Sequence, residues 1–170
     1  EDFVVGDVYE HRPGRTISET DNTWFTLLTM NTHPLHFDAE YGKASEFGRC
    51  IVASPLTLAI VVGMSVTDVS QKAIANLGWK EIRMPAPVFA GDTLYAESEV
   101  LDKRESKSRK GAGIVEFQHK AFNQNGKLVA ECKRSGLMHK CPNKECDYLE
   151  VIDPNYGKEP SAEPAESGVA

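Results

Sequence analysis

The feature that most constrains the fold is the apolar stretch SPLTLAIVVGMSVTDVS, residues 54–70. Ser54 is the expected N-cap of a helix and Pro55 its first helical residue, because serine caps free N–H groups and proline lacks one. Apolar residues fill almost every position as far as Met64, which predicts a helix buried nearly all round. Gly63 inside it predicts close packing against another element. Other elements must therefore surround this helix.

Candidate strands after residue 76 supply that cover. They are WKEIRM (79–84), DTLYAESEVLDKRES (92–106), GIVEFQHKAFN (113–123) and LVAECKRSGLMHK (128–140), the last two joined by the hairpin signal NQNG. Alternation in the second of them places on one face Leu94, Ala96, Ser98 and Val100. The simplest arrangement is an α+β fold with a curved antiparallel sheet around the long helix. The sheet keeps free edges, so a homodimer or higher homo-oligomer is expected.

Two further helices are predicted before the apolar one, after an extended entry segment with a turn at RPG (12–14). Ser18 can cap a helix within residues 16–31, in which Asp21 and Asn22 are interpreted as polar first-turn residues. The apolar stripe of this helix, expected in the core, consists of Trp24, Leu27, Leu28 and Met30. A short second helix is expected within residues 37–48.

The composition excludes several classes of protein. A chain of 170 residues, 41% hydrophobic and 26% charged, is typical of one globular domain. The net charge of -6 argues against nucleic-acid binding, and no apolar run reaches the roughly 18 residues of a membrane span. No signal peptide is visible, so a cytoplasmic location is expected. The domain is expected over residues 1–140, before a flexible tail over 141–170 that is rich in Pro, Gly, Ser and Glu.

The cysteines do not predict a metal site. Cys141 and Cys146 lie close to His139, but their spacing fits no common zinc motif and a second ligand pair is missing. We expect these two cysteines, and also Cys50 and Cys132, to be free thiols in a reducing compartment. We therefore expect no metal.

A family resemblance begins at the two histidines of MNTHPLHFDAEY (30–41). The stretch NTHPLHFDAEYGKASEFGRCIVASPLTLAIVVGMS (31–65) resembles the active-site region of MaoC-like, R-specific enoyl-CoA hydratases and dehydratases. The family pattern is Asp, any residue, Asn, Pro, an aliphatic residue and His, followed by FGR-x-IV and the buried helix. APVFAGDTL (86–94) is similar to the family's second strand. The resemblance covers about residues 3–140 and implies the hot-dog fold, in which a sheet wraps a long central helix.

The resemblance also implies roles for single residues. His36 matches the catalytic histidine, Asn31 stands where the family usually has its catalytic aspartate, and His33 where it has an asparagine. Ser54 stands at the helix start whose backbone N–H holds the thioester oxygen in relatives, although the common His-Gly-Met is here Ala53-Ser54-Pro55.

These residues suit the hydration of an α,β-unsaturated acyl-CoA, in which the CoA thioester is substrate and no cofactor is needed. His36 can take a proton from water and return it to the α-carbon. Asn31 can orient that water, and the N–H of Ser54 can stabilise the enolate oxygen. If aspartate transfers a proton in relatives, its absence costs on the order of 10²–10⁴ in rate.

The substitutions at 31 and 33 make the pocket less negative, which favours a branched dicarboxylic substrate such as itaconyl-CoA or mesaconyl-CoA. His33 or Arg49 is expected to meet its carboxylate. The loop DKRESKSRKG (102–111) is either a solvated hairpin or a CoA phosphate site. The residues predicted to contact the phosphates are Lys107, Arg109 and Lys110.

Two other functions stay open. A hot-dog thioesterase requires Asp38 or Glu40 to point into the pocket, whereas both are expected to serve the N-terminus of the second short helix. A non-catalytic acyl-CoA-binding subunit is consistent with Asn31, but His36 argues against it. His11, His119 and His139 are assigned no function.

Overall fold

A five-stranded antiparallel sheet with the strand order β1-β3-β4-β5-β2 is the main element of the computed structural model, which describes residues 3–139. The strands are β1 (Val8–Thr16), β2 (Ala73–Arg83), β3 (Thr93–Glu105), β4 (Ala112–Phe122) and β5 (Leu128–His139). The predicted tail lies outside the described residues.

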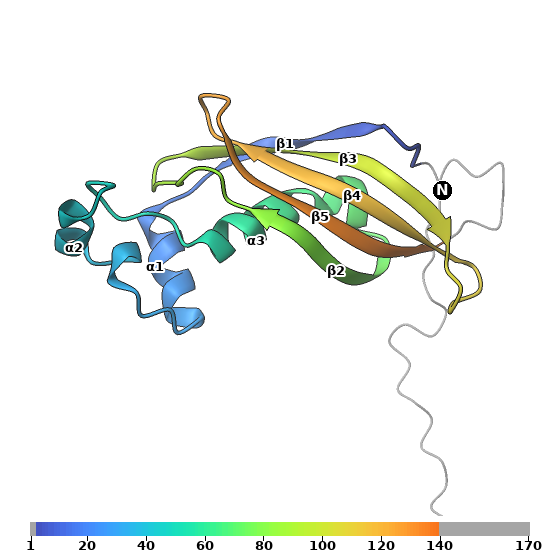
Figure 1. Cartoon of the computed structure of the whole chain (residues 1–170), viewed down its shortest axis with the longest axis horizontal. Helices are drawn as coiled ribbons and strands as arrows, with labels where there is room; N and C mark the ends of the chain where they lie inside the picture. Colours follow the sequence, from blue (N-terminus) through green and yellow to red (C-terminus); the bar gives the residue numbers. More distant parts are fainter. Residues whose placement is uncertain (1–2, 140–170) are drawn as a thin grey trace, which may run out of the picture. The chain divides into compact units, whose positions relative to one another are not determined.

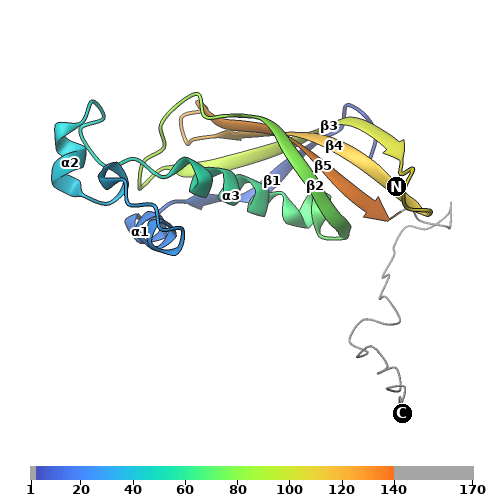
Figure 2. The ribbon, with the colours of Figure 1, turned by 60° about the horizontal axis from the view of Figure 1, so that its bottom comes forward.

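The helical elements are α1 (Glu19–Leu28), η1 (Pro34–His36), α2 (Ala39–Ala44), α3 (Ser54–Met64) and η2 (Val66–Ser70). α3 contacts β1, β3, β4 and β5, and the sheet curves over it (Figures 1 and 2). This arrangement confirms the expected α+β fold. None of the helices in the described part of the chain is long and apolar enough to cross a membrane.

The strand predictions are confirmed in most details. The inner face of β3 buries the four expected residues, Leu94, Ala96, Ser98 and Val100. The hairpin between β4 and β5 closes with the N–H of Asn123 donating to the oxygen of Lys127 at 3.0 Å. Three boundaries differ: β1 continues through RPG with a register shift between His11 and Arg15, β2 begins at Ala73 instead of Trp79, and β3 begins only at Thr93.

The burial predicted for α3 is wrong on one side of the helix. Leu56, Thr57 and Val61 are buried, but Ala59 and Gly63 are exposed, and a Cβ added at Gly63 would meet nothing within 4 Å. The physical reason is that the sheet covers only one side of α3. The N-cap is also Ala53 instead of Ser54, which is the first helical residue.

The apolar stripe of α1 is exposed, which contradicts its predicted place in the core. Trp24 is 62% exposed, Leu27 72%, Leu28 77% and Met30 86%. The helix packs through its other side, where Asn22 and Thr26 are buried. The four exposed residues are called the α1 patch below.

Candidate active site

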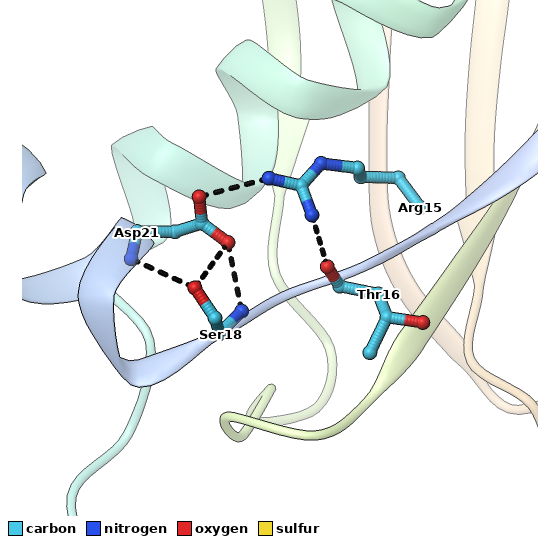
Figure 3. A network of polar contacts seen from close by, with 4 residues as sticks. All are labelled: Arg15, Thr16, Ser18 and Asp21. Carbon is cyan, nitrogen blue, oxygen red and sulfur yellow. Dashed lines mark hydrogen bonds and ion pairs between the residues drawn. The ribbon is translucent and has the colours of Figure 1, made fainter.

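The site begins with the junction of β1 and α1 (Figure 3). Ser18 caps α1: its Oγ accepts from the N–H of Asp21 at 3.1 Å, and Asp21 Oδ2 accepts from the N–H of Ser18 at 2.7 Å. Arg15 donates to Asp21 Oδ1 at 2.8 Å and to the backbone oxygen of Thr16. The bond from the Ser18 backbone is the main cause that holds the pKa of Asp21 below its usual value. These contacts fix the start of α1 against the end of β1.

Asn22, the next residue of α1, forms hydrogen bonds to three backbone groups around the site. Its Nδ2 donates to the oxygen of His36 at 2.7 Å and to that of Ile51 at 3.1 Å, and its Oδ1 accepts from the N–H of Ala53 at 2.9 Å. The side chain is only 3% exposed. The interpretation of Asn22 as a polar first-turn residue therefore missed its role, because the sequence alone gives no sign of these three distant partners.

His36 is held with one ring nitrogen free. Its Nδ1 lies 3.0 Å from the oxygen of Ile51. Because a carbonyl oxygen can only accept, Nδ1 carries a proton, and in the neutral ring Nε2 presents its lone pair. No hydrogen-bond partner of Nε2 is found among residues 3–139. The half-buried imidazole is thus arranged to accept a proton at Nε2.

The N-terminus of α3 offers a hydrogen-bond donor near this imidazole. The N–H of Ala53 is taken by Asn22, Pro55 has none, and the N–H of Leu56 donates to the oxygen of Ala53 at 2.9 Å. Within the described chain, the N–H of Ser54 has no acceptor. It lies at the positive end of the helix dipole, where a developing oxyanion is stabilised.

Asn31 and His33 lie on the same loop as His36. Asn31 Oδ1 accepts from the N–H of His33 at 3.1 Å, so its Nδ2 hydrogens remain for another partner. His33 Nδ1 accepts from the N–H of Leu35 at 3.3 Å, which leaves Nε2 as the protonated nitrogen. The ring centroids of His33 and His36 are 5.9 Å apart. The structure therefore brings Asn31, His33 and His36 together on one loop. Asn22 joins this loop to Ala53, the residue before Ser54.

The remaining predicted residues form no hydrogen bond with His36 in the part of the chain that the structure describes. The guanidinium carbon of Arg49 lies 3.9 Å from the centroid of the Phe89 ring, a cation–π contact that leaves its N–H edges accessible. Lys107, Arg109 and Lys110 are exposed in the turn between β3 and β4, at the opposite end of the sheet from α1 and α2 (Figure 1). Since β3 spans 13 residues, the separation is about 40 Å along the strand, more than one pantetheine arm covers. In one chain the structure does not bring these cations to His36.

The two carboxylates that a thioesterase would need are already engaged. Asp38 caps α2 by accepting from the N–H groups of Glu40 and Tyr41, both at 3.0 Å. Glu40 pairs with Lys43 at 2.5 Å. The Asp38 contacts confirm its expected role at the N-terminus of α2, and Glu40 lies in the first turn of that helix.

Cysteine and metal chemistry has little support in the part of the chain that the structure describes. Cys50 and Cys132 are free thiols, and burial raises the pKa of Cys132 to about 11. Residues 3–139 contain no group of three metal-ligating side chains. Cys141 and Cys146 lie outside the described residues, so the grouping with His139 is not tested.

Comparison with known proteins shows what this chain is similar to. The chain is 33% identical over 140 residues to the mesaconyl-CoA hydratase of Cereibacter sphaeroides, covering 82% of this chain but only 40% of that protein. The solved monoamine oxidase regulatory protein from Archaeoglobus fulgius matches with a TM-score of 0.75 at 36% identity, covering 82% of this chain and 93% of that one. A Mycobacterium tuberculosis protein, RV0216, described as having a double hotdog fold, matches with a TM-score of 0.76 at 22% identity, over 96% of this chain and 52% of its own. That likeness supports the fold alone, and it agrees with the expected hot-dog fold. The family model of the MaoC like domain matches residues 2–121, and the chain belongs to this family.

Proposed function

We propose that this domain adds water reversibly to the double bond of an α,β-unsaturated acyl-CoA. The observation that carries the proposal is the state of His36, whose Nδ1–H is bound to the Ile51 oxygen at 3.0 Å while Nε2 stays free. The same buried Asn22 amide binds the His36 oxygen and the N–H of Ala53. One side chain thereby joins the backbone of the base to Ala53, the residue that precedes the proposed oxyanion donor Ser54.

Each step of the reaction has a residue suited to it. Nε2 of His36 takes a proton from water as the water oxygen attacks the β-carbon, and it then returns a proton to the α-carbon. The N–H of Ser54 and the helix dipole stabilise the enolate oxygen formed in between. Asn31 orients the water through Nδ2, since its Oδ1 is occupied by His33. Asn31 is not a base, so His36 carries both proton transfers.

The substrate we propose is a branched dicarboxylic acyl-CoA of the mesaconyl-CoA or itaconyl-CoA type. The name of the Cereibacter relative supports mesaconyl-CoA for a chain of this family. His33 offers Nε2–H, and Arg49 offers guanidinium edges while its face rests on Phe89. Both are donors for a second carboxylate, in a site where Asn31 adds no negative charge.

We also propose that the working form is a homodimer. The α1 patch and the exposed Leu77, Trp79 and Ile82 of edge strand β2 form apolar surface that a second copy can cover. Phosphate contacts from Lys107, Arg109 and Lys110 remain a prediction that requires a second copy, because these cations lie far from His36 in the same chain. A thioesterase is disfavoured by the engaged Asp38 and Glu40.

The test is a mass-spectrometric assay with mesaconyl-CoA, itaconyl-CoA and crotonyl-CoA offered separately. Wild-type protein is expected to add water to a dicarboxylic thioester faster than to crotonyl-CoA. His36→Ala should lower the rate by about 10²–10⁴, whereas His139→Ala, at the far end of β5, should not. Equal activity in His36→Ala would overturn the mechanism. Release of free CoA without hydration would favour a thioesterase, and faster turnover of crotonyl-CoA would overturn the dicarboxylic preference.

A further inference from the structure

A row of polar side chains, all buried except Asp68, crosses the inner face of the sheet and is not used by the proposed reaction. Asp68 of η2 accepts from His11 Nδ1 at 2.5 Å, and His11 Nε2 lies 2.6 Å from Ser98 Oγ. Ser98 Oγ lies 2.6 Å from Nδ1 of His119 on β4. The next polar side chain in this region is Arg134 on β5, which is only 5% exposed. The hydrogen bonds of the row link η2, β1, β3 and β4, and Arg134 lies beyond them on β5.

Arg134 is a buried cation without a counter-charge among the residues that the structure describes. Its Nη2 has no hydrogen-bond partner among residues 3–139, and no acidic side chain of that range pairs with it. Nε2 of His119 is also buried and has no hydrogen-bond partner in the described part of the chain. Burial, with a smaller contribution from the Arg134 charge, lowers the pKa of His119 to about 3, so the imidazole is neutral. Buried charges in proteins are normally paired, because an unpaired one keeps its full desolvation cost.

Arg134 lines a cavity of about 180 Å³ between η2, β2 and β5. The other lining residues are Ser70, Ala73, Ala75, Asn76, Gly136 and Met138. None of them is acidic, most are apolar, and Ser70 and Asn76 bring a hydroxyl and an amide. A cavity of this kind suits a molecule with one anionic group and a small apolar body. An inorganic phosphate would need more donors than this lining offers.

We propose that this cavity binds a small organic carboxylate, with the guanidinium of Arg134 as its counter-charge. Arginine suits this role because its planar fork can donate two parallel N–H bonds to one carboxylate. The bound anion would satisfy the Nη2 hydrogens that now have no partner, and it would give the buried cation its missing negative charge. The proposal does not depend on hydratase activity.

The cavity is distinct from the site at His36. Ala53 and Leu56, at the start of α3, pack in one hydrophobic cluster with Ala130 of β5. Met138, which lines the cavity, packs with Val69 of η2 in a second cluster. Arg134 follows Ala130 by four residues, which is about 13 Å along an extended strand. The carboxylate would therefore bind toward the other end of α3.

The experiment is isothermal titration calorimetry of the full chain with acetate, succinate and mesaconate, with phosphate as the competing anion, at constant ionic strength. Wild-type protein is expected to bind at least one carboxylate and not phosphate. Arg134→Met should weaken that binding by about 10- to 100-fold, because a charged hydrogen bond is lost. Lys133→Met is the matched control: it removes one cation from the same strand, but that cation pairs with Glu81 at 2.7 Å on the other face.

Two further readings keep the test decisive. Arg134→Lys keeps the positive charge but lacks the planar fork, so it should also weaken carboxylate binding. This variant replaces Arg134→Met in the test if Arg134→Met does not fold. The ¹⁵N resonances of the His119 ring should move on addition of carboxylate, while those of His36 should not. No carboxylate binding, binding of phosphate alone, an equal loss in Lys133→Met, or a shift at His36 instead of His119 would each overturn the proposal.

Discussion

Replacing Ser54 by proline would remove one hydrogen-bond donor from the proposed site and little else. Ser54 is the first helical residue of α3, a position that proline favours. The preceding Ala53 has φ −61° and ψ 128°, the extended conformation that a residue before proline prefers. Ser54 is exposed, and its N–H has no acceptor within residues 3–139. Ser54→Pro should therefore change the free energy of unfolding by less than about 0.5 kcal/mol.

The expected effect on catalysis is much larger. Loss of one oxyanion donor lowers kcat by about 10²–10³, or about 2.7–4 kcal/mol in activation free energy. The neighbouring N–H groups offer no substitute, because Asn22 occupies that of Ala53 and the oxygen of Ala53 accepts that of Leu56. We therefore expect Ser54→Pro to show the full loss.

The assay is the initial rate of acyl-CoA hydration, with urea unfolding as the measure of stability. Ser54→Ala is the control, since it removes the hydroxyl but keeps the N–H, and it should retain nearly the wild-type rate. A folded Ser54→Pro protein that is as active as Ser54→Ala would refute the assignment of the oxyanion donor. An equal large loss in both variants would assign the effect to the side chain instead.

Three further predictions concern stability. Asn22→Ala should lower the free energy of unfolding, measured in urea, by about 2–4 kcal/mol, because the buried N–H of Ala53 and two carbonyl groups lose a partner. The same variant should lower kcat. The control is Thr23→Ala, at an exposed position of the same helix, which should change the free energy of unfolding by under about 0.5 kcal/mol. The pKa of His119 falls from 6.5 to about 3 on folding, so below pH 6.5 the unfolded chain binds a proton that the folded chain does not. The free energy of unfolding should then fall by up to about 1.4 kcal/mol for each pH unit of acidification below 6.5. In urea titrations between pH 7 and 4, His119→Asn should reduce the slope of this free energy against pH by the amount that one proton contributes. Folding lowers the pKa of Asp21 from 3.8, so the ionised carboxylate stabilises the fold above that pH and the stabilisation is lost in acid. Asp21→Asn should lower the free energy of unfolding by about 1 kcal/mol at pH 7. In thermal unfolding, the difference in stability between wild type and variant should shrink toward pH 2.

The parts of the fold that were predictable from sequence depend on neighbouring residues in the chain. Alternation places Leu94 and Val100 on the inner face of β3, and both are buried. Ser18 and Asp38 cap their helices as expected, because capping bonds join residues two or three positions apart. The position of His36 followed from the family pattern and not from its own environment.

The wrong predictions concern which surface covers an apolar residue. The α1 patch and Gly63 of α3 were expected to be packed, yet both are exposed in the single chain. Hydrophobicity shows that a residue avoids water, but it does not identify the partner that removes it from water. The contacts of Asn22 and Arg134 were missed for a related reason, since they depend on segments 14 to more than 50 positions away.

Under the proposed mechanism, the two departures from the family pattern are expected to differ in consequence. At Ala53-Ser54-Pro55 the side chains have changed, but the proposed donor is the backbone N–H of Ser54, which has no acceptor among residues 3–139. Such a site tolerates new side chains as long as the helix begins at the same residue. At Asn31 the change alters the chemistry itself, because an amide can donate to water but cannot take its proton. An Asn31→Asp variant would therefore test whether this chain has exchanged rate for tolerance of a second carboxylate: it should hydrate crotonyl-CoA faster and discriminate less in favour of mesaconyl-CoA.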